Sequence, residues 1–283
     1  MPGVSRPRIR LLALDIDGTL LTSERAVAPR TRVALDRARK AGVRLVLVTG
    51  RRFPSARRIA HVLGGDIPLV LHNGALVVDG DELLRSLVLP RGVAREATEL
   101  GLATGAEPVL HCGARGEGRL LVRTGARPSP LMRYYLERAE PDVRRVPDLL
   151  NALEDEEPMQ VMYGGGRSEM DVTRTALEDG LRDRARIERS VYPARGLVIL
   201  EVLERTVGKA EAVAFLQARW DIAAEETLAI GDNWNDREMI ARAGLGFLMG
   251  NADPDLRRLG LPVLPTNDED GVAEAVERHV LGQ

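Results

Sequence analysis

The stretch Leu11-Leu12-Ala13-Leu14-Asp15-Ile16-Asp17-Gly18-Thr19-Leu20 carries the strongest indication of the fold class in this chain. It opens on a continuous apolar run, which is typical of a strand covered on both faces in a parallel sheet. Asp15 stands where that strand should end, and the carboxyl ends of strands form the edge at which open α/β sheets bind ligands. Gly18 then allows a sharp turn. On this stretch alone, a strand ending in a solvated Asx turn is the alternative interpretation.

The segments beyond this stretch alternate between helix and strand patterns. A helix is expected over residues 29–41, with proline near its start and glycine just after its end, and a strand follows over 43–48. The same rhythm returns after residue 204, where a helix over 209–219 precedes a strand over 227–230. Strand–helix–strand units at this spacing predict an α/β fold whose core is a Rossmann-like, doubly wound parallel sheet.

The middle of the chain has a different pattern. Residues 84–192 lose the regular alternation and gain charge, and their length is common for a domain. We therefore expect residues 84–192 to form an inserted α+β domain, and residues 1–83 and 193–283 to form the core together. The two junctions are expected near the Asn73-Gly74 turn and the Arg195-Gly196 loop.

A triple glycine, Gly164-Gly165-Gly166, interrupts this middle segment and predicts a loop. It does not match the dinucleotide-binding fingerprint, because Glu169 stands where the third glycine of that motif should be. The acidic run at 154–157 is interpreted as a solvated face without chemistry.

Polar groups follow three of the expected core strands. They are Asp15 and Asp17 after the first strand, Thr49 and Gly50 after the second, and Asp232 and Asp236 after the strand over 227–230. Because the carboxyl ends of parallel strands share one edge of a sheet, we expect these groups to converge. Two carboxylates about 4 Å apart repel by about 4 kcal/mol at an effective dielectric constant of about 20, so such a cluster needs a cation or a shared proton. Oxygen ligands without a nearby His or Cys favour magnesium over zinc.

Lys209 is notable because the chain uses arginine almost everywhere else for positive charge. The only other lysine is Lys40, which lies at the expected end of a helix, where any cation would serve. An ammonium retained in such a chain indicates a need for a compact point charge, and a chance surface lysine is the alternative.

Composition restricts the class of protein. The 283 residues are 44% hydrophobic and 29% charged, which indicates a globular chain of one large or two moderate domains. A net charge of −2 gives no general attraction to nucleic acid or membranes, and Cys112 alone cannot form an intrachain disulfide. The first residues lack the apolar core of a signal peptide, and no run reaches membrane-spanning length. We expect a cytoplasmic protein without a nucleic-acid or membrane partner, and its oligomeric state is left open.

The motifs, taken together, resemble those of the haloacid dehalogenase superfamily of hydrolases. The resemblance rests on Asp15-Ile16-Asp17-Gly18-Thr19-Leu20, Thr49-Gly50-Arg51, Lys209 and Gly231-Asp232-Asn233-Trp234-Asn235-Asp236, in that order. Two further stretches, residues 249–252 and 266–272, are similar to its Cof-like sugar-phosphatase branch. The position and length of the middle segment resemble the large α/β cap, or type IIB cap, of that branch.

The resemblance implies catalytic roles for three residues. Asp15 would attack phosphorus and form an aspartyl-phosphate. Asp17 would protonate the leaving alcohol and then deprotonate the hydrolytic water. Lys209 would neutralise charge on the phosphate and on Asp15.

The resemblance also implies binding roles. Thr49 and the amide of Gly50 would bind phosphate oxygens, and Asn235 would contact phosphate or orient Asp15. Arg51 would approach phosphate or form a structural salt bridge, and both interpretations stay open. Mg²⁺ would be held by Asp15, the backbone carbonyl of Asp17 and Asp232, with Asp236 supporting the site from behind.

These expectations combine into a magnesium-dependent phosphatase that acts on a small phosphorylated metabolite, in particular a sugar phosphate. The alternatives are a phosphomutase or phosphotransferase of the same superfamily, and a non-catalytic protein that binds a phosphorylated ligand. The acids at positions 15, 17, 232 and 236 argue against the last alternative, because a binding module has no need for four of them. The substrate itself is not readable from these residues, since selectivity would lie in the cap.

Overall fold

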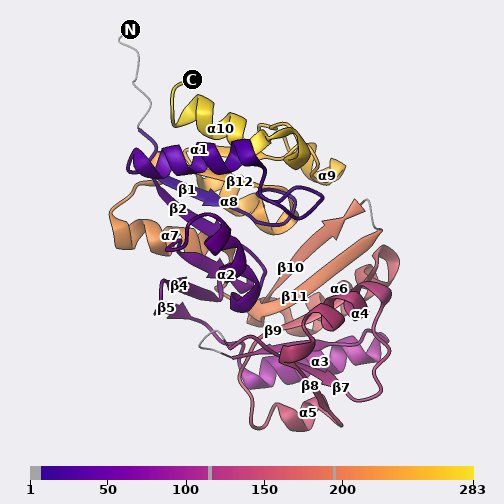
Figure 1. Cartoon of the computed structure of the whole chain (residues 1–283). Helices are drawn as coiled ribbons and strands as arrows, with labels where there is room; N and C mark the ends of the chain where they lie inside the picture. The colour runs from indigo at the N-terminus through magenta and orange to yellow at the C-terminus, as the bar shows by residue number, and fades with distance from the viewer. Residues whose placement is uncertain (1–7, 114–116, 194–195) are drawn as a thin grey trace. The chain divides into compact units, whose positions relative to one another are not determined.

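The computed structural model describes residues 8–113, 117–193 and 196–283, which divide into two compact units. The first unit contains residues up to 50, then 55–82 and 208–283. The second contains residues 51–54 and 83–207. Figure 1 shows the elements of both units.

The first unit is built on a seven-stranded sheet with the order β13-β12-β1-β2-β3-β4-β5, and the edge strand β5 continues past Glu82 into residues of the second unit. Strands β13, β12, β1, β2 and β3 pair in parallel, and β4 is antiparallel to β3. The strand bounds are β1 Leu11–Leu14, β2 Arg44–Val48, β3 Leu69–Leu71, β4 Leu76–Asp79, β5 Glu82–Ser86, β12 Thr227–Gly231 and β13 Leu245–Leu248. The chain order runs outward from β1 in both directions, so the topological switch point lies between β1 and β12.

Helices cover this sheet. Every side chain of β1 is fully buried, which requires cover on both faces. Helix α1 packs against α10, and α7 packs against α8 (Figure 1). The helix bounds are α1 Pro29–Lys40, α2 Phe53–Val62, α7 Lys209–Trp220, α8 Arg237–Arg242, α9 Pro254–Arg257 and α10 Gly271–His279. The expectation of a doubly wound parallel-sheet core is therefore confirmed.

The second unit is an α+β structure around a six-stranded sheet with the order β10-β11-β9-β6-β7-β8. Its strands pair antiparallel except β7 and β8, which are parallel. Helices α3 and α6 pack against each other, and Met132 of α4 belongs to an apolar cluster with Val109 and Met162 of the sheet. The bounds are β6 Val109–Cys112, β7 Arg119–Arg123, β8 Val143–Val146, β9 Pro158–Gly166, β10 Ala185–Tyr192, β11 Leu197–Glu204, α3 Arg91–Ala103, α4 Pro130–Arg138, α5 Leu149–Ala152 and α6 Arg167–Leu181.

The prediction of a loop at the triple glycine is wrong, because these residues form the end of strand β9. Gly164 pairs with Ile199 and Gly165 pairs with Val198. A Cβ atom on Gly164 would lie 2.5 Å from Met132 Sδ, and one on Gly165 would lie 2.3 Å from an oxygen of Glu169. The glycines therefore serve close packing against the sheet rather than a turn.

The domain boundary expected at residue 193 also needs correction. Strand β11, which that division assigned to the core, pairs with β9 and β10, and the second unit continues to Val207. Antiparallel pairing between neighbouring strands outweighs the local similarity of this apolar strand to those of the core. One of the two expected junctions is the Arg195-Gly196 loop, and Arg195 lies outside the described residues.

The described residues contain no helix that is long and apolar enough to cross a membrane. The stretch interpreted as lacking a signal peptide, residues 1–7, lies outside the described part of the chain.

Candidate active site

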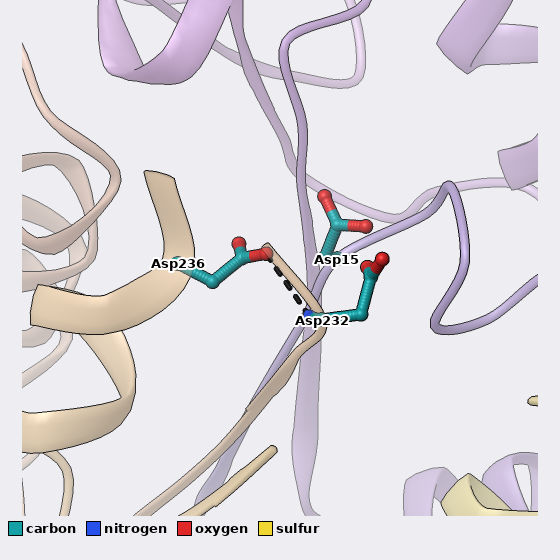
Figure 2. Close-up of side chains that lie close together, drawn as sticks. All are labelled: Asp15, Asp232 and Asp236. Atoms are coloured by element: carbon teal, nitrogen blue, oxygen red, sulfur yellow. Dashed lines mark hydrogen bonds between the residues drawn. The ribbon is translucent and has the colours of Figure 1, made fainter. Parts of the chain in front are cut away.

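Three acids meet at the carboxyl ends of β1 and β12. These strands are neighbours, with Leu14 opposite Ile230, and the backbone amide of Asp15 donates to the carbonyl of Ile230 at 3.0 Å. Asp15 and Asp232 each follow directly after their strand, and Asp236 lies in the turn that comes next. Figure 2 shows the three side chains directed toward one shared space. All three are buried, and their carboxylate oxygens come within 4.8 Å of one another.

Lys209, the first residue of α7, joins two of these acids. Its Nζ atom donates to Asp15 Oδ1 and to Asp236 Oδ1, each at 2.6 Å. The side chain is 1% exposed. A buried ammonium is stable only when it is paired, and here two carboxylates pair with it. The contact therefore supports the interpretation of Lys209 as a required point charge.

Asp236 is held on both of its oxygens. Its Oδ1 accepts from Lys209, and its Oδ2 accepts the backbone amides of Asp232 at 3.2 Å and Asn233 at 3.0 Å. Figure 2 marks the bond to the amide of Asp232. With both oxygens engaged, Asp236 fixes the loop after β12 and the position of Lys209.

Asp232 is set by the loop after β1. Thr19 Oγ1 donates to Asp232 Oδ1 at 2.9 Å. Gly18 has a φ of +84°, and a Cβ atom there would lie 2.4 Å from Asp232 Oδ2. Only glycine therefore fits between the turn and this carboxylate.

The two motifs near the C-terminus hold this same loop. Asn251 Nδ2 donates to the carbonyl of Gly18 at 2.8 Å, and Asn267 Nδ2 donates to the carbonyl of Leu21 at 2.8 Å. The backbone amide of Asn267 in turn donates to Asn251 Oδ1 at 3.0 Å. These asparagines thus give a structural reason for the motifs at 249–252 and 266–272.

The electrostatics of the cluster favour a bound cation. Burial raises the pKa of Asp15 to about 7; the charge of Lys209 opposes this shift, and those of Asp236 and Asp17 add to it. Burial, followed by the charges of Asp15 and Asp236, raises the pKa of Asp232 well above its usual value. Burial alone would lower the pKa of Lys209, but Asp15 and Asp236 outweigh it and raise that pKa. The carboxylates outnumber the ammonium, so the ionised cluster has excess negative charge.

The residues fit a hard divalent cation. The ligand atoms that come together are carboxylate oxygens, and no His or Cys belongs to this group within the described residues. Such a donor set suits Mg²⁺ rather than zinc. Asp15 and Asp232 are the residues best placed to hold the ion, since Asp236 already accepts three hydrogen bonds. The side chain of Asp17, half-buried nearby, is not part of the group.

The loop after β2 lies next along the same edge. Thr49 is buried, its amide donates to the carbonyl of Val70 at 2.8 Å, and its carbonyl accepts from the amide of Asn73 at 3.0 Å. Gly50 follows it and is half-buried. Arg51, the next residue expected to bind substrate, is half-buried and belongs to the second unit, so its role stays a prediction.

Asn73 makes a contact that its sequence context does not predict. Its Oδ1 accepts from Nδ2 of Asn235 at 2.9 Å, and both side chains are buried. An Asn-Gly pair directly after a strand was the available signal, but it indicates only a turn. The contact with Asn235, far away in the sequence, depends on the folded sheet.

Comparison with known proteins places the chain in a class. The sequence profile of the haloacid dehalogenase-like hydrolases matches residues 12–276, and the chain belongs to this family. The family predicted from the motifs is thus confirmed.

Individual relatives agree along nearly the whole chain. The phosphatase YwpJ of Bacillus subtilis is 27% identical over 96% of this chain and 100% of its own length. An HMP-PP phosphatase of Serratia proteamaculans is 30% identical over 90% of this chain and 88% of its own. The crystal structure of a haloacid dehalogenase-like hydrolase from Bacteroides thetaiotaomicron superposes with a TM-score of 0.78 at 27% identity, covering 96% of this chain and 99% of that one.

Proposed function

We propose that this chain, a phosphatase of the haloacid dehalogenase type, hydrolyses a sugar phosphate or a similar small metabolite through an aspartyl-phosphate on Asp15. The observation that carries the proposal is the buried group of Asp15, Asp232 and Asp236 around the ammonium of Lys209. A carboxylate at a strand end beside a compact positive charge is suited to attack an anionic phosphoryl group.

Asp15 is the proposed nucleophile. Its Oδ1 is held by Lys209 at 2.6 Å, which leaves Oδ2 as the atom that forms the bond to phosphorus or meets the metal. The hydrogen bond from the amide of Asp15 to Ile230 fixes the backbone beneath it. The positive charge of Lys209 favours the ionised nucleophile and so opposes the effect of burial, which raises the pKa of Asp15.

Asp17 is the proposed acid and base. It lies two residues beyond the nucleophile, is half-buried, and contributes to the raised pKa of Asp15, so the two carboxyl groups interact. In the first half-reaction it donates a proton to the leaving oxygen, and in the second it accepts one from water. Thr49 and the amide of Gly50 are the proposed donors to the phosphate oxygens.

Mg²⁺ is the proposed cofactor, held by Asp15, the backbone carbonyl of Asp17 and Asp232. When bound, it would neutralise charge on the phosphoryl group as a Lewis acid. Asp236 supports this site through the amides of Asp232 and Asn233.

The second unit is proposed to select the substrate. The proposed catalytic residues and metal ligands all lie in the first unit, so the chemistry does not depend on side chains of residues 83–207. The curated relatives carry different names, one an HMP-PP phosphatase and one a phosphatase without a stated substrate, so family membership does not fix the substrate.

The test is phosphate release from a panel of sugar phosphates, nucleotides and cofactor phosphates, with Mg²⁺ and with excess chelator. We expect release from at least one small sugar phosphate, loss of activity with chelator, and better recovery with Mg²⁺ than with Ca²⁺, which prefers more ligands and longer bonds. No release from any member would contradict the proposed function. Full activity in excess chelator would show that the reaction does not require a metal ion.

A further inference from the structure

The turn after β3 has an unusual backbone. His72, Asn73 and Gly74 follow one another with φ values of +48°, +54° and +110°. The left-handed region costs a residue with a Cβ atom roughly 1–2 kcal/mol, and such conformations persist only where the surrounding structure holds them. The turn is fully buried, so its contacts must supply that restraint.

Those contacts reach three separate segments of the candidate active site. The amide of Asn73 donates to the carbonyl of Thr49 at 3.0 Å, and its Oδ1 accepts from Asn235 at 2.9 Å. A Cβ atom on Gly74 would lie 2.3 Å from the carbonyl oxygen of Gly208, the residue before Lys209. One turn therefore touches the loop of Thr49, the start of the lysine helix and the loop of Asn235.

The bond between the two asparagines fixes the orientation of an amide. Only the NH₂ group of Asn235 can donate to the carbonyl oxygen of Asn73, so Asn235 cannot rotate its amide by half a turn without losing this bond. In this orientation Asn235 Oδ1 is buried and accepts no hydrogen bond within the described residues. A buried polar atom of this kind needs a partner, and a bound ligand is the available source.

We propose that Asn73 is a positioning residue that holds the side-chain amide of Asn235 in one orientation for a phosphate-bearing ligand. This inference rests on the proposed function, because it takes the ligand of the site to be a phosphoryl group. Asn73 itself is not proposed to touch the ligand. By holding the amide, Asn73 leaves Oδ1 and the second Nδ2 hydrogen of Asn235 available to bind the ligand.

Two substitutions distinguish the effect of losing the Asn73 side chain from the effect of straining the backbone. Asn73→Gly removes the hydrogen-bond acceptor and adopts the left-handed conformation without strain. Asn73→Ala also removes the acceptor, but its backbone is strained in that conformation. Both should lower kcat/KM for p-nitrophenyl phosphate about tenfold, because each removes one buried hydrogen bond that orients the amide proposed to contact the charged phosphate. Binding of inorganic phosphate in Mg²⁺, measured by calorimetry, should weaken by a similar factor. Asn73→Ala should unfold at a lower temperature than Asn73→Gly.

A double-mutant cycle with Asn235→Ala tests the path of the effect. If Asn73 acts through Asn235, adding Asn73→Gly to Asn235→Ala should change kcat/KM and phosphate binding by less than twofold. Asp221→Gly is the matched control, because Asp221 is an exposed left-handed residue (φ +51°) at the end of α7, and it should leave both quantities unchanged.

Three results would overturn the inference. They are an Asn73→Gly variant within twofold of the parent, the same loss in the Asn235→Ala background, or a larger kinetic loss for the less stable Asn73→Ala variant. A parent chain that binds phosphate but hydrolyses no ester overturns only the proposed function, and the phosphate-binding cycle still decides the role of Asn73. A parent chain that neither binds nor hydrolyses overturns both.

Discussion

Buried polar side chains occupy different places in the two units. In the first unit, the buried charges of Asp15, Lys209 and Asp232 lie at strand ends or at the start of a helix. In the second, a group of buried polar side chains lies within strands of the sheet. Gln160 in β9 donates to Glu201 Oε1 in β11 at 2.9 Å, and its Nε2 lies 3.3 Å from Nδ1 of His111 in β6.

The difference follows from how each sheet is built. The parallel strand ends of the first unit share one edge, which brings together charges from distant parts of the chain and directs them toward one shared space (Figure 2). Within the second sheet, neighbouring strands place single polar residues side by side, where Gln160 Nε2 contacts Glu201 and His111. We interpret the first arrangement as reactive and the second as structural, and the following experiments test that division.

The largest effect is expected at the nucleophile. Asp15→Asn keeps the shape of the side chain but removes its charge, so turnover of any phosphate ester should fall by about 10⁴-fold or more. Phosphate release measured at high enzyme concentration gives the value. Asp36→Asn, which changes an exposed acid paired with Lys40 on α1, is the matched control and should leave the rate unchanged. Hydrolysis by Asp15→Asn within tenfold of the parent would exclude the aspartyl-phosphate.

Asp17→Asn should be costly only where the leaving group needs a proton. For an ordinary sugar phosphate we expect a loss of about 10²–10⁴-fold, the usual contribution of a general acid. For p-nitrophenyl phosphate, whose leaving group needs no proton, formation of the aspartyl-phosphate should continue, and rapid quenching should trap it. Equal losses with both esters would count against Asp17 as the acid.

Lys209→Arg tests whether the strand-end site needs a compact charge. Lys209 Nζ lies 2.6 Å from two carboxylates in a buried position, and the larger planar guanidinium does not fit that place. We expect kcat to fall by about 10²-fold, comparable to the loss of one donor that stabilises the transition state. Lys40→Arg, at the chain's other lysine, is exposed and should retain the full rate. A fully active Lys209→Arg variant would show that no compact charge is needed there and would favour the alternative that Lys209 is a chance lysine.

Gln160→Leu should affect stability rather than chemistry. The substitution removes the Gln160 amide that donates to Glu201, so the buried Glu201 carboxylate loses this hydrogen bond. The free energy of unfolding should fall by about 1–3 kcal/mol. Urea unfolding measures this, and the rate with p-nitrophenyl phosphate should stay within twofold of the parent. Gln217→Leu is the comparison. It removes the hydrogen bond from half-buried Gln217 of α7 to Thr227 Oγ1, and it should cost less. A large kinetic loss for Gln160→Leu would break the division between reactive and structural groups.

The smallest effect is expected in the pH dependence of stability. The pKa of Asp15 rises from 3.8 to about 7 on folding, so the folded state binds that proton more tightly than the unfolded chain. Its contribution to stability is present below about pH 4 and is lost as the pH rises toward 7. Without metal, the melting temperature should fall between pH 5 and pH 7.5 by several degrees, since 1 kcal/mol corresponds to roughly 2–4 °C in a chain of this size.

Two further arms sharpen this measurement. Mg²⁺ should raise the melting temperature more at pH 7.5 than at pH 5, because it binds the ionised carboxylates. Asp15→Asn should flatten the dependence on pH, since Asn does not titrate. A parent and an Asp15→Asn variant with the same slope would show that Asp15 does not carry the effect.

The groups at strand ends could be predicted because they depend on local pattern. A buried apolar run followed by Asp15, and a second one followed by Asp232, are readable in a single sequence. The parallel order of strands then brings them together without further information. The unusual retention of Lys209 pointed to a specific contact of its ammonium for the same reason, since composition is visible without a structure.

Other features depend on contacts between distant residues. The triple glycine was interpreted as a loop because its packing partners, Met132 and Glu169, act only in the folded unit. Strand β11 resembles a core strand in its apolar pattern, yet pairing with β10 places it in the second sheet. Asn73 has the pattern of an ordinary turn.

The α/β class, the family and the acids that cluster at one sheet edge can be predicted from the sequence, because periodicity and strand-end motifs are local properties of the chain. The bonds from Lys209 to Asp15 and Asp236, and the bond between Asn73 and Asn235, are seen only in the folded structure. The physical reason is that a hydrogen bond requires two groups within about 3 Å. Spacing along the chain does not specify that distance for residues that are far apart in the sequence.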